Sequence, residues 1–213
     1  MNRKINFSVI IVLISIICLF FSCEGREDGP CEIKSDYYFT GLVFSEEICL
    51  NDGHDGVGIN CGFYPNAVGD PDRGTYRFGL DTEPVLRFDR WISFVTPEVY
   101  KTNFTYLWEI FEPGIKFFTD PSTLSNKKFD FEYTMITSVM TNIPALTHYF
   151  TIYGDQSGST LQVLEREEIT EPGSEYRDFR VKMIINCKLY NQNGAYQGEI
   201  LDLETQLKIS VLQ

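Results

Sequence analysis

The sequence predicts a mainly β fold, an antiparallel β-sandwich or jelly roll that contains one α-helix. Apolar side chains occupy every second position in many short runs, which is the pattern of strands with one buried face. Clusters of Gly, Asn, Asp and Pro separate these runs, and only one segment has helical spacing. The chain is also rich in Phe and Tyr, with 17 and 12 copies, and these residues favour strands.

The first segment has the composition of a secretory signal. Arg3 and Lys4 precede an apolar run over residues 5–21, and acidic residues follow it in place of stop-transfer lysines. The run is shorter than the roughly 20 apolar residues of a membrane-spanning helix. We therefore predict a signal peptide over residues 1–22 that is removed from the mature chain.

Cys23 is the predicted site of lipid attachment. It follows the small Ser22, an arrangement that resembles the lipobox at which bacterial lipoproteins are acylated and cleaved. A diacylated and N-acylated cysteine, with palmitate as a typical acyl chain, supplies the several chains that stable anchoring needs. Residues 23–34 would then form the lipidated cysteine and an acidic tether, and residues 35–213 the β-sandwich domain.

The acidic residues after Cys23 bear on location. A cysteine followed closely by acids resembles the export signal of Bacteroidetes-type lipoproteins, which predicts an outer-membrane protein facing the cell exterior. A plain polar linker on the periplasmic face is the alternative.

Removal of Arg3 and Lys4 with the signal peptide changes the formal charge of the chain from −12 to about −14 (−12 − 2). Such an acidic chain repels nucleic acid, so we expect no nucleic-acid partner.

Four further cysteines of the exported chain predict disulfides. An even number in an oxidising compartment indicates two bonds with three connectivities, and the long, irregular spacings do not suit zinc. Strand alternation puts two of the four on apolar faces, which favours Cys61–Cys187 together with Cys31–Cys49.

The strongest strand signal is the alternation of apolar residues over residues 179–189, followed by a hairpin turn over residues 191–194. Shorter strands are predicted over residues 37–44, 57–63, 75–80, 85–95, 129–134, 148–153, 160–168 and 206–212.

One helix is predicted over residues 97–112. Thr96 offers an N-cap, Pro97 suits the first helical position, and Pro113-Gly114 offers a stop. Its buried stripe would contain Tyr100, Phe104, Leu107, Trp108 and Phe111. The aromatic density of this segment would also fit a strand.

The order of these elements is similar to that of a group of small, uncharacterised Bacteroidetes lipoproteins. The likeness rests on Trp91-Ile92-Ser93-Phe94, on a helix ending in Phe111-Glu112-Pro113-Gly114, on Phe129-Asp130-Phe131-Glu132-Tyr133, and on Val181 to Tyr190 leading to a hairpin with Gly194. The resemblance covers much of residues 75–213 and implies a β-sandwich with one helix and no assigned activity.

The most polar loops contain Asp52, Asp55, Asp70 and Asp72. Carboxylates on a glycine-rich loop suit Ca²⁺, but the spacing does not match an EF-hand, and turns use the same residues. An ordinary loop without a cofactor is the favoured interpretation, and a Ca²⁺ site is the alternative.

No complete catalytic set is recognisable. Asp130 with Glu132, and Glu165 with Glu167, alternate on strands and can lie about 5 to 9 Å apart, as glycosidases require, but exposed strand faces commonly carry such acids. We therefore expect no enzyme. The predicted function is a lipid-anchored, non-enzymatic surface protein that binds glycan or another protein.

The alternatives to that function are a purely structural envelope component and, less favoured, a glycan-active enzyme. Trp91, Trp108 and the tyrosines offer a sugar-stacking platform, although core packing is the commoner use of aromatic residues. Tyr37, Tyr38 and Tyr196 fit a core pattern least.

Overall fold

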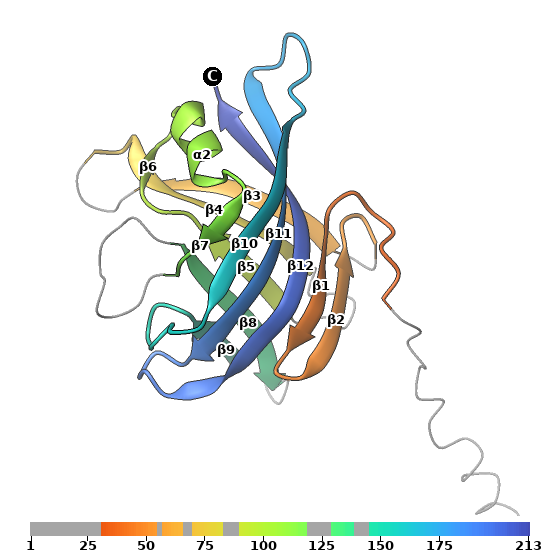
Figure 1. Cartoon of the computed structure of the whole chain (residues 1–213), viewed down its shortest axis with the longest axis vertical. Coiled ribbons are helices and arrows are strands. Elements are labelled where there is room, and N and C mark those ends of the chain that lie inside the picture. Colours follow the sequence, from red (N-terminus) through yellow and green to blue (C-terminus); the bar gives the residue numbers. More distant parts are fainter. Residues whose placement is uncertain (1–30, 55–56, 66–69, 83–89, 119–128, 139–144) are drawn as a thin grey trace, which may run out of the picture. The chain divides into compact units, whose positions relative to one another are not determined.

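Antiparallel strands build almost the whole fold (Figure 1). The computed structural model describes residues 31–54, 57–65, 70–82, 90–118, 129–138 and 145–213. Its strands are β1 (Tyr38–Val43), β2 (Glu46–Asn51), β3 (Val57–Pro65), β4 (Arg73–Thr82), β5 (Arg90–Val95), β6 (Val99–Tyr100), β7 (Gly114–Lys116), β8 (Asp130–Ser138), β9 (Ala145–Phe150), β10 (Thr160–Glu168), β11 (Tyr176–Tyr190) and β12 (Tyr196–Leu212). The described helix is α2 (Phe104–Ile110).

The strands form one sheet in the order β2-β1-β12-β11-β9-β8-β5-β4-β3. Strand β10 pairs with β11 and β7, and β6 pairs with β4. Every pairing between these named strands is antiparallel. The predicted fold class is confirmed, because the described chain is mainly β with one helix and its open antiparallel sheet is consistent with a β-sandwich.

Strands β11 and β12 form the long hairpin that the alternation predicts. Buried side chains recur at every second position from Phe179 to Leu189. At the turn, the Gly194 N–H donates a 2.9 Å hydrogen bond to the Asn191 carbonyl, and Gly194 has a φ of 79°, which suits glycine. Strand β12 starts at Tyr196, earlier than the predicted residue 206. The sequence pattern missed its first part because an irregularity around Asp202 interrupts the alternation of buried and exposed side chains.

A bulge in β1 matches this irregularity in β12. The register of the β1–β12 pair shifts between Thr40 and Leu42, at Gly41. A Cβ atom at Gly41 would lie only 2.6 Å from the Leu203 Cα atom. Only glycine therefore allows the two backbones to approach so closely here.

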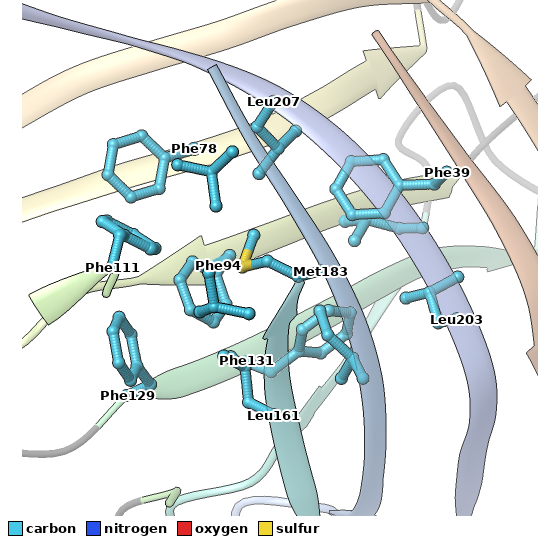
Figure 2. Close-up of a cluster of buried hydrophobic side chains, with 14 of the residues drawn as sticks. Phe39, Phe78, Phe94, Phe111, Phe129, Phe131, Leu161, Met183, Leu203 and Leu207 are labelled. Atoms are coloured by element: carbon cyan, nitrogen blue, oxygen red, sulfur yellow. The ribbon is translucent and has the colours of Figure 1, made fainter. Parts of the chain in front are cut away.

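The core lies between the two halves of the sheet and is rich in Phe (Figure 2). Phe78, Phe94 and Phe131 come from β4, β5 and β8, and they share one cluster with Met183 and Leu207 of β11 and β12. The Phe94 and Phe129 rings stack with centroids 4.9 Å apart. This packing joins strands that are distant in the sheet order, so it holds the bent sheet together.

Helix α2 is shorter than predicted. It begins after Asn103, whose side chain accepts a 2.9 Å hydrogen bond from the Tyr106 N–H and so caps the helix. The preceding Val99–Tyr100 segment is strand β6, which pairs with Gly74 and Arg73 of β4. The prediction of a helix from residue 97 was wrong because this pairing takes those residues into the sheet.

The buried stripe of the helix is partly confirmed. Phe104, Leu107 and Phe111 are buried, and Trp108 is half-buried, but Tyr100 lies outside the helix and is 49% exposed. Within the described ranges, no helix has both the length and the apolar character needed to cross a membrane.

The cysteines confirm one predicted disulfide and correct the other. Cys31 and Cys49 are bonded to each other. Cys187 carries a free thiol that is buried in the core, so the predicted Cys61–Cys187 bond was wrong. Cys187 lies on β11 and Cys61 on β3, and four strands separate β11 from β3 along the sheet order. Cys187 therefore serves as a small apolar side chain.

Candidate functional site

A depression of about 460 Å³ lies at the corner where β6 and α2 meet the segment that leads into β4. Figure 1 shows β6 and α2 close together at one end of the fold. The described residues that line the depression are Asp70, Asp72, Tyr100, Thr102 and Asn103. We refer to this depression as the corner pocket. Its volume falls within the usual range of small-molecule sites.

Backbone hydrogen bonds fix the acidic side of the corner pocket. The Asp72 N–H donates a 3.0 Å bond to the Asp70 carboxylate, which closes a turn. The Asp72 carbonyl accepts a 2.8 Å bond from the Lys101 N–H. The segment before β4 is therefore tied to the segment that precedes α2, and the turn holds the Asp70 carboxylate.

A buried tyrosine supports the floor of this corner. The hydroxyl of Tyr76, a residue only 3% exposed, donates a hydrogen bond to the Lys101 carbonyl. The Tyr76 N–H donates to the Thr96 hydroxyl over 3.0 Å, and its ring packs against Phe63 and Phe78. These contacts connect the corner pocket to the hydrophobic core, so its geometry is preorganised.

Tyr100 supplies the aromatic surface of the corner pocket. The Arg73 guanidinium lies 5.5 Å from the centroid of the Tyr100 ring. The same guanidinium lies 3.4 Å from a Glu98 carboxylate oxygen. A cation over the ring and the pairing of β6 with β4 both limit its motion. With about half of its surface exposed, Tyr100 still offers an apolar area to a ligand.

The remaining lining residues add hydrogen-bonding groups of both kinds. The Asn103 side-chain oxygen caps α2, which leaves its amide nitrogen as the donor that it can offer. Thr102 contributes a hydroxyl, and ionised Asp70 and Asp72 contribute acceptors. An aromatic surface beside acceptors and donors suits a polyhydroxylated ligand, which has apolar C–H faces and many hydroxyl groups.

The structure brings together two of the four predicted metal ligands. Asp70 and Asp72 line the corner pocket, whereas Asp52 follows strand β2 and is not part of the lining. Asp55 lies outside the described residues. Among the residues with described positions, no group of three or more His, Cys, Asp and Glu side chains has a geometry suited to a metal.

The predicted acid pairs lie elsewhere, in contact with other side chains. Glu132 lies 3.2 Å from the His148 Nδ1 atom and 3.5 Å from Arg77. Asp130 accepts hydrogen bonds from the Thr151 hydroxyl and, over 2.8 Å, from the Phe131 N–H. Neither acid lines the corner pocket.

The second acid pair lies on an exposed stretch of β10. Glu167 forms an ion pair with Arg180, and Glu165 stands opposite Lys182 in the register. A bulge between Val163 and Glu165 interrupts the alternation of this strand. Glu165 and Glu167 therefore face basic residues of the neighbouring strand and lie outside the corner pocket.

The sequence predicted the exposure of the aromatic residues only in part. Tyr196 is 53% exposed, as its pattern suggests, but Tyr38 is 5% exposed and Tyr37 is half-buried. Trp108 packs against Phe104 of the same helix, and Arg166 covers its ring. The side chain of Trp91 lies outside the described set.

Sequence reasoning missed the aromatic and amide side of the corner pocket. It placed Tyr100, Thr102 and Asn103 inside a helix. Asn103 directly before the apolar stripe is itself an N-cap signal. Placing the start of the helix there would have freed Tyr100 for the surface.

Cys23, the predicted lipid attachment site, lies in the part of the chain that the structure does not describe. Comparison of the chain with models of protein families, with curated proteins and with solved structures finds no match.

Proposed function

We propose that the chain is a non-enzymatic binding protein of the cell envelope that takes carbohydrate in the corner pocket. The observation that carries this proposal is the half-exposed Tyr100 ring beside the hydrogen-bonding groups of Asp70, Asp72, Thr102 and Asn103. Aromatic rings bind the apolar face of a sugar, and carboxylate and amide groups bind its hydroxyls.

Preorganisation supports a binding role. The lining residues are held by a turn, by the cap of α2 and by the Tyr76 hydrogen bond, all of which exist without a ligand. A site that needs little ordering loses less free energy when it binds. Because the depression is open to solvent, it can bind one end or one unit of a polysaccharide while the rest of the ligand extends into solvent.

The proposed location follows from the signals at the start of the chain. Ser22 and Cys23 resemble a lipobox, and the acidic residues after them resemble an export signal. We infer attachment to the outer membrane through Cys23, with the β domain facing the cell exterior. A lipid anchor would hold the corner pocket at the surface where extracellular polysaccharide is present.

The anchor has its own test. A Cys23→Ser variant, expressed in a bacterium with a lipoprotein pathway and labelled with a palmitate analogue, should carry no label and should stay unprocessed or be released. Cys18→Ser is the matched control, because Cys18 lies in the same apolar run without a small residue before it. Labelling of Cys23→Ser at the wild-type level would contradict the anchor and leave the binding proposal in place.

The binding proposal is tested with the full chain and a panel of neutral polysaccharides. A ligand at a hundred times its dissociation constant should add roughly 2.7 kcal/mol to the free energy of unfolding, which is measurable as a rise in Tm. Tyr100→Ala should lose this rise. Tyr196→Ala is the matched control, because it removes another tyrosine of similar exposure, 53% against 49%.

Two outcomes would contradict the binding proposal. One is the absence of a Tm shift with every member of the panel. The other is an equal shift for wild type and Tyr100→Ala. If the chain binds no polysaccharide, a protein ligand becomes the favoured alternative. The first surface residues to test for that ligand are Ile115 and Phe117, which are 60% and 63% exposed.

A further inference from the structure

We propose that the corner pocket selects carbohydrate by charge, so that it binds amino sugars and neutral sugars and rejects uronic acids. This inference rests on the proposed carbohydrate function and adds the class of ligand. It follows from the charges that surround the pocket and from the kinds of hydrogen-bonding group that line it.

The ionisable lining of the pocket is acidic. Asp70 and Asp72 both line it, and among the residues whose positions the structure describes no Lys or Arg does. Arg73 is a basic residue beside the pocket, and its guanidinium lies over the Tyr100 ring and 3.4 Å from Glu98. Arg73 is therefore already matched by an opposite charge and does not compensate for the two aspartates.

The wider corner remains negative when its other charges are counted. Asp70, Asp72 and Glu98 contribute −3, and Arg73 and Lys101 contribute +2, which leaves −1. The chain as a whole carries a formal charge of −12. An anionic sugar therefore meets repulsion during its approach and again in the pocket.

Hydrogen-bond matching acts in the same direction. Ionised carboxylates only accept hydrogen bonds, so Asp70 and Asp72 need donors from the ligand. A sugar hydroxyl supplies one donor and a protonated amino group supplies three, with a favourable charge in addition. A uronate carboxylate supplies none and would place a third negative charge beside the two aspartates. Selection therefore combines an attraction for one class and a repulsion against another.

Three hexasaccharides test this selection: a glucosamine oligomer, its neutral N-acetylated counterpart and a galacturonate oligomer. Titration calorimetry of the full chain at about pH 5.5 measures the three affinities while the amino groups of glucosamine are protonated. We expect the galacturonate oligomer to bind at least about fivefold more weakly than the neutral oligomer, and the glucosamine oligomer to bind most tightly. High salt should shrink these differences, because the charges are exposed.

The charge variants make the test specific to the corner pocket. Asp70→Asn combined with Asp72→Asn keeps the side-chain shapes and should bring the three affinities close together. The matched control combines Glu47→Gln with Glu175→Gln, which removes the same two charges from exposed positions outside the pocket. This control should keep the wild-type order of affinities.

The outcomes separate this inference from the proposed function. Galacturonate binding as tightly as the neutral oligomer, or an unchanged order in the double aspartate variant, would overturn charge selection while carbohydrate binding stands. Absence of binding by all three oligomers and by the neutral polysaccharide panel would overturn the proposed function itself, and charge selection with it.

Discussion

Tyr38 donates a 2.6 Å hydrogen bond to the Glu204 carboxylate, although 166 positions separate the two residues in the sequence. Lys182 lies 3.0 Å from the same carboxylate oxygen. These residues belong to β1, β12 and β11, so one carboxylate connects three neighbouring strands. The hydrogen bond from Tyr38 lowers the pKa of Glu204 below its ordinary value of 4.5, and the contact with Lys182 acts in the same direction.

Tyr38→Phe should therefore destabilise the fold at neutral pH by about 1 kcal/mol, because it removes one donor from a partly buried carboxylate. A lowered carboxyl pKa stabilises the fold above pH 4.5, and this stability is lost as the pH falls through the lowered pKa. The difference between variant and wild type should accordingly be smaller at about pH 3. Urea unfolding measures both values, and Tyr196→Phe, which loses an exposed hydrogen bond to Glu199, is the control. Equal stability of Tyr38→Phe and wild type at neutral pH would contradict this role.

Asp130→Asn should leave the fold as stable as wild type, or more stable by about 1 kcal/mol, at neutral pH. Burial of the carboxyl raises the pKa of Asp130, although hydrogen bonds from Thr151 and Phe131 oppose the shift. A raised pKa gives stability that is complete below the ordinary pKa of 3.8 and is lost as the pH rises through the folded-state value. The asparagine oxygen can accept the same two bonds without a buried charge.

The measurement is urea unfolding of wild type and Asp130→Asn from about pH 3 to pH 7, with the exposed Asp36→Asn as control. Wild type should lose stability relative to Asp130→Asn as the pH rises. A variant that is less stable at neutral pH by more than about 1 kcal/mol would show that the charge itself is needed.

Cys187 should react with iodoacetamide only after the fold is opened. Its thiol is buried, and burial, followed by the field of Asp130, raises the pKa of Cys187 well above its ordinary 9.0. Little of it is therefore present as the reactive thiolate. Peptide mapping by mass spectrometry, without reductant and with or without guanidinium chloride, measures this directly. Absence of label on Cys187 in denaturant would indicate that it is disulfide-bonded, as the sequence predicted.

Removal of the Cys31–Cys49 disulfide should cost about 3 kcal/mol, because the bond closes a loop of 19 residues that includes both cysteines (49 − 31 + 1). The double variant Cys31→Ala with Cys49→Ala should show this loss in urea unfolding. Reductant should lower the stability of wild type by a similar amount and leave the variant unchanged. A variant as stable as oxidised wild type would show that the bond constrains little in the unfolded chain.

Phe111→Ala should destabilise the fold by about 3 to 5 kcal/mol, since it opens a cavity among packed rings. The Phe111 ring centroid lies 5.4 to 6.2 Å from those of four other residues, which are Phe78, Phe94, Phe129 and Phe179. Phe117→Ala is the control, because Phe117 is 63% exposed. Similar losses for the two variants in guanidinium unfolding would contradict the central place of Phe111.

The sequence by itself determined the fold class, most strands and the long β11–β12 hairpin. Alternation is a local signal, because successive side chains of a strand point to opposite faces whatever the strand pairs with. The turn at Gly194 is equally local, since it depends on a backbone conformation that few residues adopt. For the candidate site, the same local reasoning singled out Asp70 and Asp72 as polar loop residues.

Only the tertiary structure decided the features that depend on partners distant in the sequence. Pairing with β4 converted the expected start of the helix into β6 and so exposed Tyr100 beside the two aspartates. The order of strands kept Cys187 apart from Cys61, and the Tyr38 hydroxyl found Glu204. The physical reason is the same in each case: alternation fixes which face a side chain takes, whereas the strand that lies next to it depends on packing across the whole core.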